Sequence, residues 1–283
     1  MLKKVRIFFK LIKFEHTVFA LPFAYMGMVL AERRLPALPV LIWTTLAMIG
    51  ARTAGMTLNR IIDIEIDRRN PRTQSRPSVT GEFRISWSWI AVAVSLVIFF
   101  LSSWFLNPLC FKLSFAALIF LVGYHYVKRF SFLCHFTLGI VLAIAPVGGW
   151  FAVTGIFSWK PLLLAAAVLF WTAGFDILYS LQDVDFDRAN GLHSVPVKFG
   201  KDEALVISRG CHVATVVFLA LFGWAVGLGL VYWAGIAVCA VLLWVEHNLI
   251  RDGDLTNINA AFFMVNGWVG VLLFIFTFME IFR

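Results

Sequence analysis

The sequence predicts an all-α, polytopic membrane protein, and its composition is the first reason. Of the 283 residues, 61% are hydrophobic and only 14% are charged, so the chain has more apolar side chain than one soluble core can bury. A backbone in hydrocarbon must satisfy its amides and carbonyls internally, so long apolar runs are expected to be helical. We expect a single domain over residues 1–283, in which about nine helices surround a central cavity open to the cytoplasmic side.

Apolar runs between charged and turn residues are the second reason. A helix needs roughly 20 mainly apolar residues to cross a bilayer, and such runs occur along the whole sequence. The expected spans are 14–31, 38–56, 86–106, 108–127, 132–153, 161–181, 204–225, 229–247 and 257–281. The first run is not followed by a small-residue cleavage site, so we expect it to be retained as a span.

The distribution of basic residues is the third reason, and it also predicts an orientation. If the N-terminus is cytoplasmic, the inside segments hold most of the Lys and Arg residues. Because positive charges concentrate in cytoplasmic loops, we expect the C-terminus on the opposite side of a bacterial-type cytoplasmic membrane. The net charge of +8 is then a feature of topology, and neither a nucleic acid nor an obligate protein partner is expected.

Acidic residues gather in two long inside segments, 57–85 and 182–203. Asp63 and Asp67 of the first segment recur at the same spacing as Asp183 and Asp187 of the second. The two segments follow spans at equivalent places in the chain, which indicates a weak internal duplication. Both clusters are therefore expected to face one cavity.

Helical periodicity places the acids of each cluster on a common face. At about 100° per residue, Asn59 lies on the face of Asp63 and Asp67. Asp176 joins Asp183 and Asp187 in the same way if the sixth span stays helical to its end. The other acids of these segments, Glu65 and Asp185, point elsewhere.

Carboxylates at this spacing require a positive partner. They repel one another on a helix and are costly near a bilayer. Oxygen ligands without His or Cys suit Mg²⁺, which takes one or two carboxylates and completes its shell with water and substrate phosphates. The clusters thus predict a diphosphate held through Mg²⁺. The alternative is that both segments are solvated loops whose acids balance nearby arginines, but two copies at equivalent places favour the site.

Basic residues beside the first cluster fit the same chemistry. Arg72 and Arg76 are four residues apart and could bind phosphate oxygens in a forked arrangement, although isolated arginines of this kind more often determine topology. At the end of the fourth span, two basic residues are either inside anchors or diphosphate ligands, and two tyrosines are either interface aromatics or pocket walls. These residues are Lys128, Arg129, Tyr124 and Tyr126.

Several motifs together resemble the UbiA superfamily of intramembrane aromatic prenyltransferases. The motifs are Asn59-Arg-x-x-Asp63-x-x-x-Asp67, Phe14-Glu-His-Thr-Val-Phe-Ala-Leu-Pro-Phe, Asn70-Pro-Arg-Thr, Leu178-Tyr-Ser-Leu-Gln-Asp-Val-Asp-Phe-Asp-Arg and Gly191-Leu-His-Ser-Val-Pro. They extend from the first span to the loop after the sixth. The expected number of spans also agrees with this family.

The resemblance implies a prenyl transfer in which Mg²⁺ ions bind the diphosphate and stabilise it as a leaving group. The implied metal ligands and catalytic residues are Asp63, Asp67, Asp183 and Asp187. Positions that match the family's diphosphate contacts are Asn59, Arg72, Arg76 and Lys128, with Lys13 as a further contact in the first span. Asp176 matches an acid that orients the acceptor or extends the metal shell, and Tyr126 is a candidate for the acceptor side.

The second-cluster motifs are most similar to the 4-hydroxybenzoate polyprenyltransferases of respiratory quinone biosynthesis. That likeness implies attack of an allylic cation on the ring carbon ortho to the hydroxyl. A sister group prenylates 1,4-dihydroxy-6-naphthoate in the futalosine route to menaquinone, and the motifs leave both acceptors open.

Two other classes of membrane protein also use clustered acids. A cation-coupled transporter predicts broken helices with charges at mid-membrane, whereas here the acids follow spans two and six without a Gly/Pro break near the middle of either. A CDP-alcohol phosphotransferase would carry a DGxxAR-type motif, which is missing. A prenyltransferase is therefore the favoured function.

Overall fold

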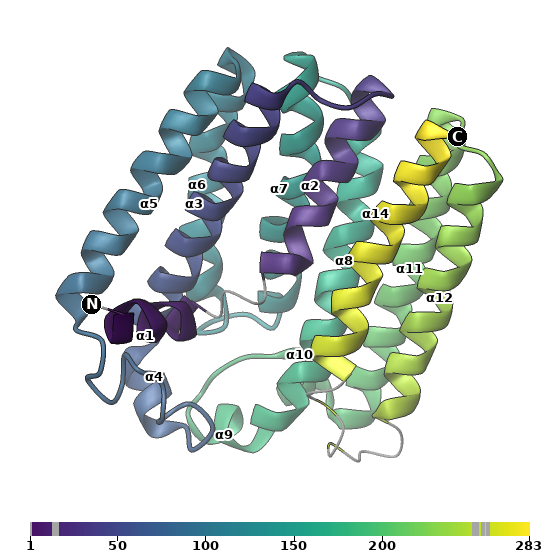
Figure 1. Cartoon of the computed structure of the whole chain (residues 1–283). Helices are drawn as coiled ribbons and strands as arrows, with labels where there is room; N and C mark the ends of the chain where they lie inside the picture. The colour runs from purple at the N-terminus through teal and green to yellow at the C-terminus, as the bar shows by residue number, and fades with distance from the viewer. Residues whose placement is uncertain (1, 13–16, 251–254, 256–257, 259–260) are drawn as a thin grey trace.

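The computed structural model describes residues 2–12, 17–250, 255, 258 and 261–283, and within this part of the chain every regular element is a helix (Figure 1). The long helices are α2 (Thr17–Glu32), α3 (Leu38–Ile62), α5 (Ile85–Leu106), α6 (Pro108–Val127), α7 (Cys134–Thr154), α8 (Lys160–Ser180), α11 (Lys201–Val226), α12 (Leu230–Leu249) and α14 (Asn266–Phe282). The expected all-α architecture is confirmed.

Seven helices of the described part are long and apolar enough to cross a membrane. Two further apolar stretches, Ala20–Glu32 and Asn266–Phe282, are shorter. They overlap the expected spans 14–31 and 257–281, which include residues outside the described set. The polytopic architecture is thus established. The count of nine membrane spans and the opening of the cavity to the cytoplasm stay predictions.

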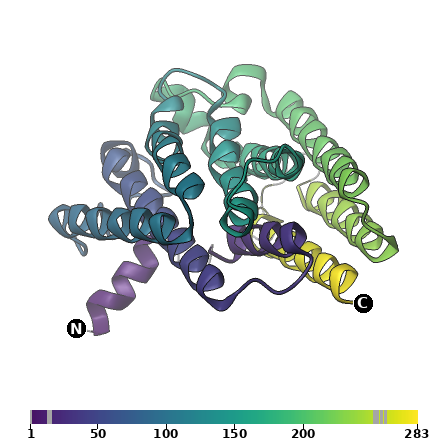
Figure 2. The same cartoon turned by 90° about the horizontal axis from the view of Figure 1, so that it is seen from above.

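Short helices gather at one end of the bundle (Figure 1). The helix α4 (Ile64–Arg69) directly follows α3, and α9 (Val184–Ala189) follows α8 after a single 3-10 turn. The helix α1 (Leu2–Ile12) lies across this end and projects from one edge of the bundle in the view from above (Figure 2). Both aspartate segments therefore lie at the same end of the molecule.

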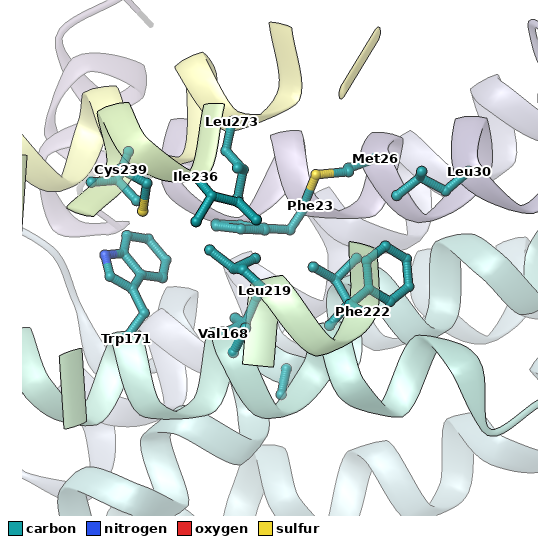
Figure 3. Packing of buried hydrophobic residues seen from close by; sticks show 14 of the residues in the cluster. Phe23, Met26, Leu30, Val168, Trp171, Leu219, Phe222, Ile236, Cys239 and Leu273 are labelled. Carbon is teal, nitrogen blue, oxygen red and sulfur yellow. The ribbon is translucent and has the colours of Figure 1, made fainter. Parts of the chain in front are cut away.

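A buried apolar cluster joins α2, α7, α8, α11, α12 and α14, and part of it is drawn in Figure 3. Its members include Phe23, Met26, Leu30, Val168, Trp171, Leu219, Phe222, Ile236, Cys239 and Leu273. Helix association in lipid depends on close packing and interhelical hydrogen bonds, because the tails are as apolar as the side chains. Trp171 contributes to both: its ring packs inside the cluster, and its Nε1 donates a hydrogen bond to Asn266 Oδ1 at 2.8 Å.

Glycine allows α2 and α7 to approach closely. A Cβ added at Gly149 would overlap the carbonyl oxygen of Ala24, and one added at Gly27 would overlap that of Pro146. The neighbouring Gly148 has nothing within 4 Å of such a Cβ. Small residues of this kind are typical of tight helix interfaces in membranes.

Replacing Gly149 with valine is expected to destabilise the protein, because the new side chain meets backbone that cannot move aside. We expect a loss of about 1–3 kcal/mol in the free energy of unfolding, as for other overpacked interfaces. Thermal unfolding in detergent measures the effect, with Gly148→Val, whose new Cβ meets open space, as the matched control. Equal stability of Gly149→Val and the control would contradict this packing.

Candidate active site

The first aspartate cluster is built by a break in one helix. The helix α3 ends at Ile62, and Asp63 caps it with φ −95° and ψ 8° before α4 begins. The amide of Asp63 still donates to Asn59 O at 3.0 Å, and that of Asp67 donates to Asp63 O at 2.8 Å. The four-residue spacing of the three side chains is therefore preserved across the break.

Asp63 lies at the centre of a buried polar group. Its side chain is only 2% exposed, and its Oδ2 accepts hydrogen bonds from Asn59 Nδ2 at 2.8 Å and from Lys128 Nζ at 2.6 Å. Arg129 approaches the other oxygen at 3.5 Å and donates to Ile62 O at 2.8 Å. The structure thus brings together the predicted residues Asn59, Asp63 and Lys128.

Asp67 and Asp183 are each paired with an arginine of the segment 70–84. Arg76 Nη1 donates to Asp67 Oδ2 at 2.6 Å. Arg72 forms a fork on Asp183, with Nε donating to Oδ1 at 2.9 Å and Nη2 donating to Oδ2 at 2.5 Å. Asn70 Nδ2 adds a third donor to Asp183 at 3.0 Å. Because Arg72 follows the first cluster and Asp183 belongs to the second, this contact joins the two.

The environment of Arg72 favours its charge. Partial burial acts to lower the pKa of the guanidinium, but the hydrogen bond and the charge of Asp183 outweigh it, so the pKa of Arg72 is raised. Its Nη1 also donates to Tyr179 Oη at 3.2 Å, and the guanidinium carbon lies 5.2 Å from the centre of the Tyr179 ring. Tyr179 therefore helps to orient the arginine.

Asp187 completes the four predicted acids. It lies in α9, partly buried, and among the described residues no side chain donates a hydrogen bond to its carboxylate. In that part of the chain there is also no group of three or more His, Cys, Asp or Glu residues that could by itself hold a metal ion. A divalent cation here would need further oxygen ligands, and Mg²⁺ commonly takes them from water and substrate phosphates.

Asp176 is held by a residue that the sequence did not indicate. His135, in the first turn of α7, contacts Asp176 Oδ2 through Nδ1 at 2.7 Å. Its Nε2 accepts a hydrogen bond from the amide of Val195 at 3.2 Å. No spacing signal in the sequence links these three residues, because they come from three separate segments.

Two other buried groups were also missed. Arg60 is 4% exposed, and it donates to Asn59 Oδ1 at 2.9 Å and to Leu11 O at 3.2 Å. His125 Nδ1 lies 3.3 Å from Asn59 Nδ2. Arg60 follows Asn59 directly in the first motif, so the sequence could have indicated Arg60 as a residue of the site.

The structure does not place Tyr126 among the residues that contact the aspartates. Its side chain is 44% exposed, and the guanidinium of Arg129 lies 5.5 Å from its ring. The other tyrosine of this segment, Tyr124, faces a cavity instead.

Lys13 lies outside the described residues. Glu65 is exposed and paired with Arg68 at 2.8 Å, away from the clusters as expected.

A largely apolar cavity of about 560 Å³ lies among the helices. The walls come mainly from α3, α6 and α7, with further residues from α2, α5 and α8. Met56 and Tyr124 are in the lining, each about one helical turn before Asn59 or Lys128 in the chain. The cavity thus begins one turn deeper in the bundle than the first cluster.

Sequence comparisons identify the family. The model of the UbiA prenyltransferase family matches residues 20–268. A 4-hydroxybenzoate octaprenyltransferase of Burkholderia orbicola is 32% identical over 240 residues, which cover 84% of this chain and 83% of the relative. The enzyme of the same name from Shewanella woodyi is 30% identical over 275 residues and covers 96% of both chains.

Solved structures show the same fold. An apo structure of a UbiA homolog from Aeropyrum pernix K1 has a TM-score of 0.84 and 36% identity, covering 92% of this chain and 95% of its own. A UbiA homolog from Archaeoglobus fulgidus, solved with DMAPP and Mg²⁺, has a TM-score of 0.72 and 19% identity over 97% of this chain and 98% of its own. With apolar helices that can cross a bilayer and a family match over most of its length, the chain belongs to the UbiA prenyltransferase family and is an integral membrane prenyltransferase.

Proposed function

We propose that this protein transfers a polyprenyl group from a polyprenyl diphosphate to 4-hydroxybenzoate, with Mg²⁺, in respiratory quinone biosynthesis. The observation that carries the proposal is the pairing of aspartates from two distant segments with three basic residues, one turn from an apolar cavity. The relatives named 4-hydroxybenzoate octaprenyltransferase support 4-hydroxybenzoate as the acceptor. The cavity suits an isoprenoid tail, because most of its lining is apolar; its polar lining residues include Arg52, Thr44, Ser103 and Ser114.

The carboxylates fit Mg²⁺ by their chemistry. They offer oxygen only, they come from two facing segments, and too few of them cluster to form a cage without phosphate oxygens. The proposed ligands are Asp63, Asp67, Asp183 and Asp187. When bound, Mg²⁺ would neutralise the diphosphate and favour its departure.

The basic side chains have the complementary role. Arg72, Arg76 and Lys128 each donate to one of these carboxylates. In the substrate complex we place their donors on the diphosphate oxygens, where they stabilise the charge that develops as the carbon–oxygen bond breaks. Asn59, which donates to Asp63, holds that carboxylate in place. Lys13 is proposed as a further contact from the first span.

The acceptor is placed on the Asp176 side of the site. The allylic cation forms a bond to the ring carbon ortho to the hydroxyl, and that carbon then loses its proton to restore aromaticity. Apolar walls exclude water, which would otherwise capture the cation as a prenyl alcohol. Tyr124 lines the cavity and is a better candidate than Tyr126 for this wall.

The acceptor is tested by incubating membranes that contain the protein with a radiolabelled polyprenyl diphosphate and Mg²⁺. Parallel reactions receive 4-hydroxybenzoate or 1,4-dihydroxy-6-naphthoate. We expect labelled product with 4-hydroxybenzoate. Product with the naphthoate alone would assign the chain to the futalosine route, and transfer to neither would contradict the proposal.

The orientation in the membrane is proposed from the basic residues, with the aspartate end and the N-terminus in the cytoplasm. In a variant without native cysteines, Glu82→Cys, in the exposed loop before α5, should react with an impermeant maleimide only from the cytoplasmic side. Arg34→Cys, in the exposed loop before α3, should react only from the other side. The reverse pattern would overturn the orientation.

A further inference from the structure

His135 connects two parts of the site that are far apart in the chain. Its imidazole is 3% exposed and lies between the Asp176 carboxylate on α8 and the Val195 amide at the start of α10 (Val195–Phe199). Both ring nitrogens are engaged, at 2.7 Å and 3.2 Å. A buried ring with two committed nitrogens has one orientation, so it fixes both of its partners.

The hydrogen bonds also determine where the imidazole proton lies. The Val195 N–H points at Nε2, so this nitrogen must be the acceptor and carry no proton. The proton is then on Nδ1, which donates it to Asp176. A doubly protonated ring would set two N–H groups against each other at Nε2.

The consequence falls on Asp176. One of its oxygens receives the His135 proton, while among the described residues none donates a hydrogen bond to the other oxygen. The Asp176 side chain is 26% exposed although that of His135 is buried. The carboxylate is therefore fixed at one oxygen, and its second oxygen is available to accept a hydrogen bond.

The same imidazole stabilises the segment 191–196. The amide of His193 donates to Lys128 O at 2.7 Å, and Cys134 Sγ contacts His193 O at 3.4 Å. This segment is thus attached to the turn between α6 and α7 that carries Lys128, whose Nζ reaches Asp63. His135 adds a second link, because its ring contacts both the Val195 amide of this segment and Asp176 on α8.

We propose that His135 is a positioning residue for the aromatic acceptor: its Nδ1–H holds the Asp176 carboxylate so that the free oxygen accepts the acceptor's hydroxyl group. This inference rests on the proposed function, since it assigns a role within the same reaction. The acceptor class it implies is an aromatic ring with a free hydroxyl. An O-alkylated analogue should not be held.

Two substitutions separate the two hydrogen bonds of His135. An asparagine amide nitrogen falls near the position of Nδ1, so H135N keeps a donor for Asp176 and loses the contact to Val195. A glutamine amide reaches the position of Nε2, so H135Q keeps an acceptor for Val195 and loses the donor. His193→Gln is the matched control, because the His193 side chain is exposed.

We expect H135Q to lower kcat/KM for the acceptor on the order of tenfold, the size of one charge-assisted hydrogen bond. H135N and His193→Gln should stay within about threefold of wild type, and the KM for the prenyl diphosphate should change in none of them. Equal losses in H135N and H135Q, or a parallel rise in the KM for the diphosphate, would overturn the proposal. Turnover by the wild-type protein in the same assay tests the proposed function separately.

A measurement on the wild-type protein keeps the test valid if a variant does not fold. In ¹⁵N-histidine-labelled protein, the ring nitrogens of His135 should report a neutral imidazole with its proton on Nδ1. The signal is assigned by its loss in H135N or, if that variant is not recovered, by its coupling to the labelled Val195 amide. A proton on Nε2, with or without one on Nδ1, would overturn the assignment.

Discussion

Asp183→Asn is expected to reduce prenyl transfer by a factor on the order of 10²–10³, comparable to the removal of one key electrostatic contact from an active site. The carboxylate receives a fork from Arg72 and a hydrogen bond from Asn70, so it lies where the two aspartate clusters meet. Asparagine keeps the shape but removes the charge that Mg²⁺ requires. Turnover is measured with purified protein at saturating concentrations of both substrates.

The fold should survive this substitution. Arg72 and Asp183 both remain partly exposed, and the asparagine side-chain oxygen can still accept a hydrogen bond from Arg72. Asp185→Asn is the matched control, because this acid is two residues away, exposed and outside the site. Near-normal turnover by Asp183→Asn, or an equal loss in Asp185→Asn, would count against the assigned role.

Removal of divalent metal is expected to have an equally large effect. Without Mg²⁺, the four aspartates would repel a diphosphate, and the three basic partners alone would have to overcome that repulsion. Excess EDTA should therefore reduce transfer to background, and added Mg²⁺ should restore it.

The control for the metal experiment is Ca²⁺, a larger ion with less strict geometry. It should restore much less activity than Mg²⁺. Full turnover in EDTA would rule out a metal-dependent mechanism and leave the carboxylates without their proposed role.

Several features were predictable because they depend on local patterns. Apolar runs define the helices, and a four-residue repeat places Asn59, Asp63 and Asp67 on one face even though α3 ends at Ile62. The sixth span is different. The shared face of Asp176, Asp183 and Asp187 depended on a sixth span that stays helical to its end, whereas α8 ends at Ser180 and a 3-10 turn covers Leu181–Asp183.

Other features depend on tertiary contacts, which no single-sequence pattern contains. The ring of His135 meets Asp176 and Val195 from separate segments. Tyr124 and Tyr126 are two residues apart and therefore about 200° apart on α6, so only packing determines which one faces the cavity. The structure places Tyr124 in the lining and leaves Tyr126 44% exposed.

The central claim is that the two aspartate clusters together hold one diphosphate through Mg²⁺. Calorimetric titration with a prenyl thiodiphosphate, which resists cleavage, tests it without turnover. We predict saturable binding with Mg²⁺, no measurable binding in EDTA, and affinities lowered by about tenfold or more in both Asp63→Asn and Asp183→Asn. Binding that is equally tight without Mg²⁺, or that is unaffected by substitution in one of the clusters, would contradict the claim.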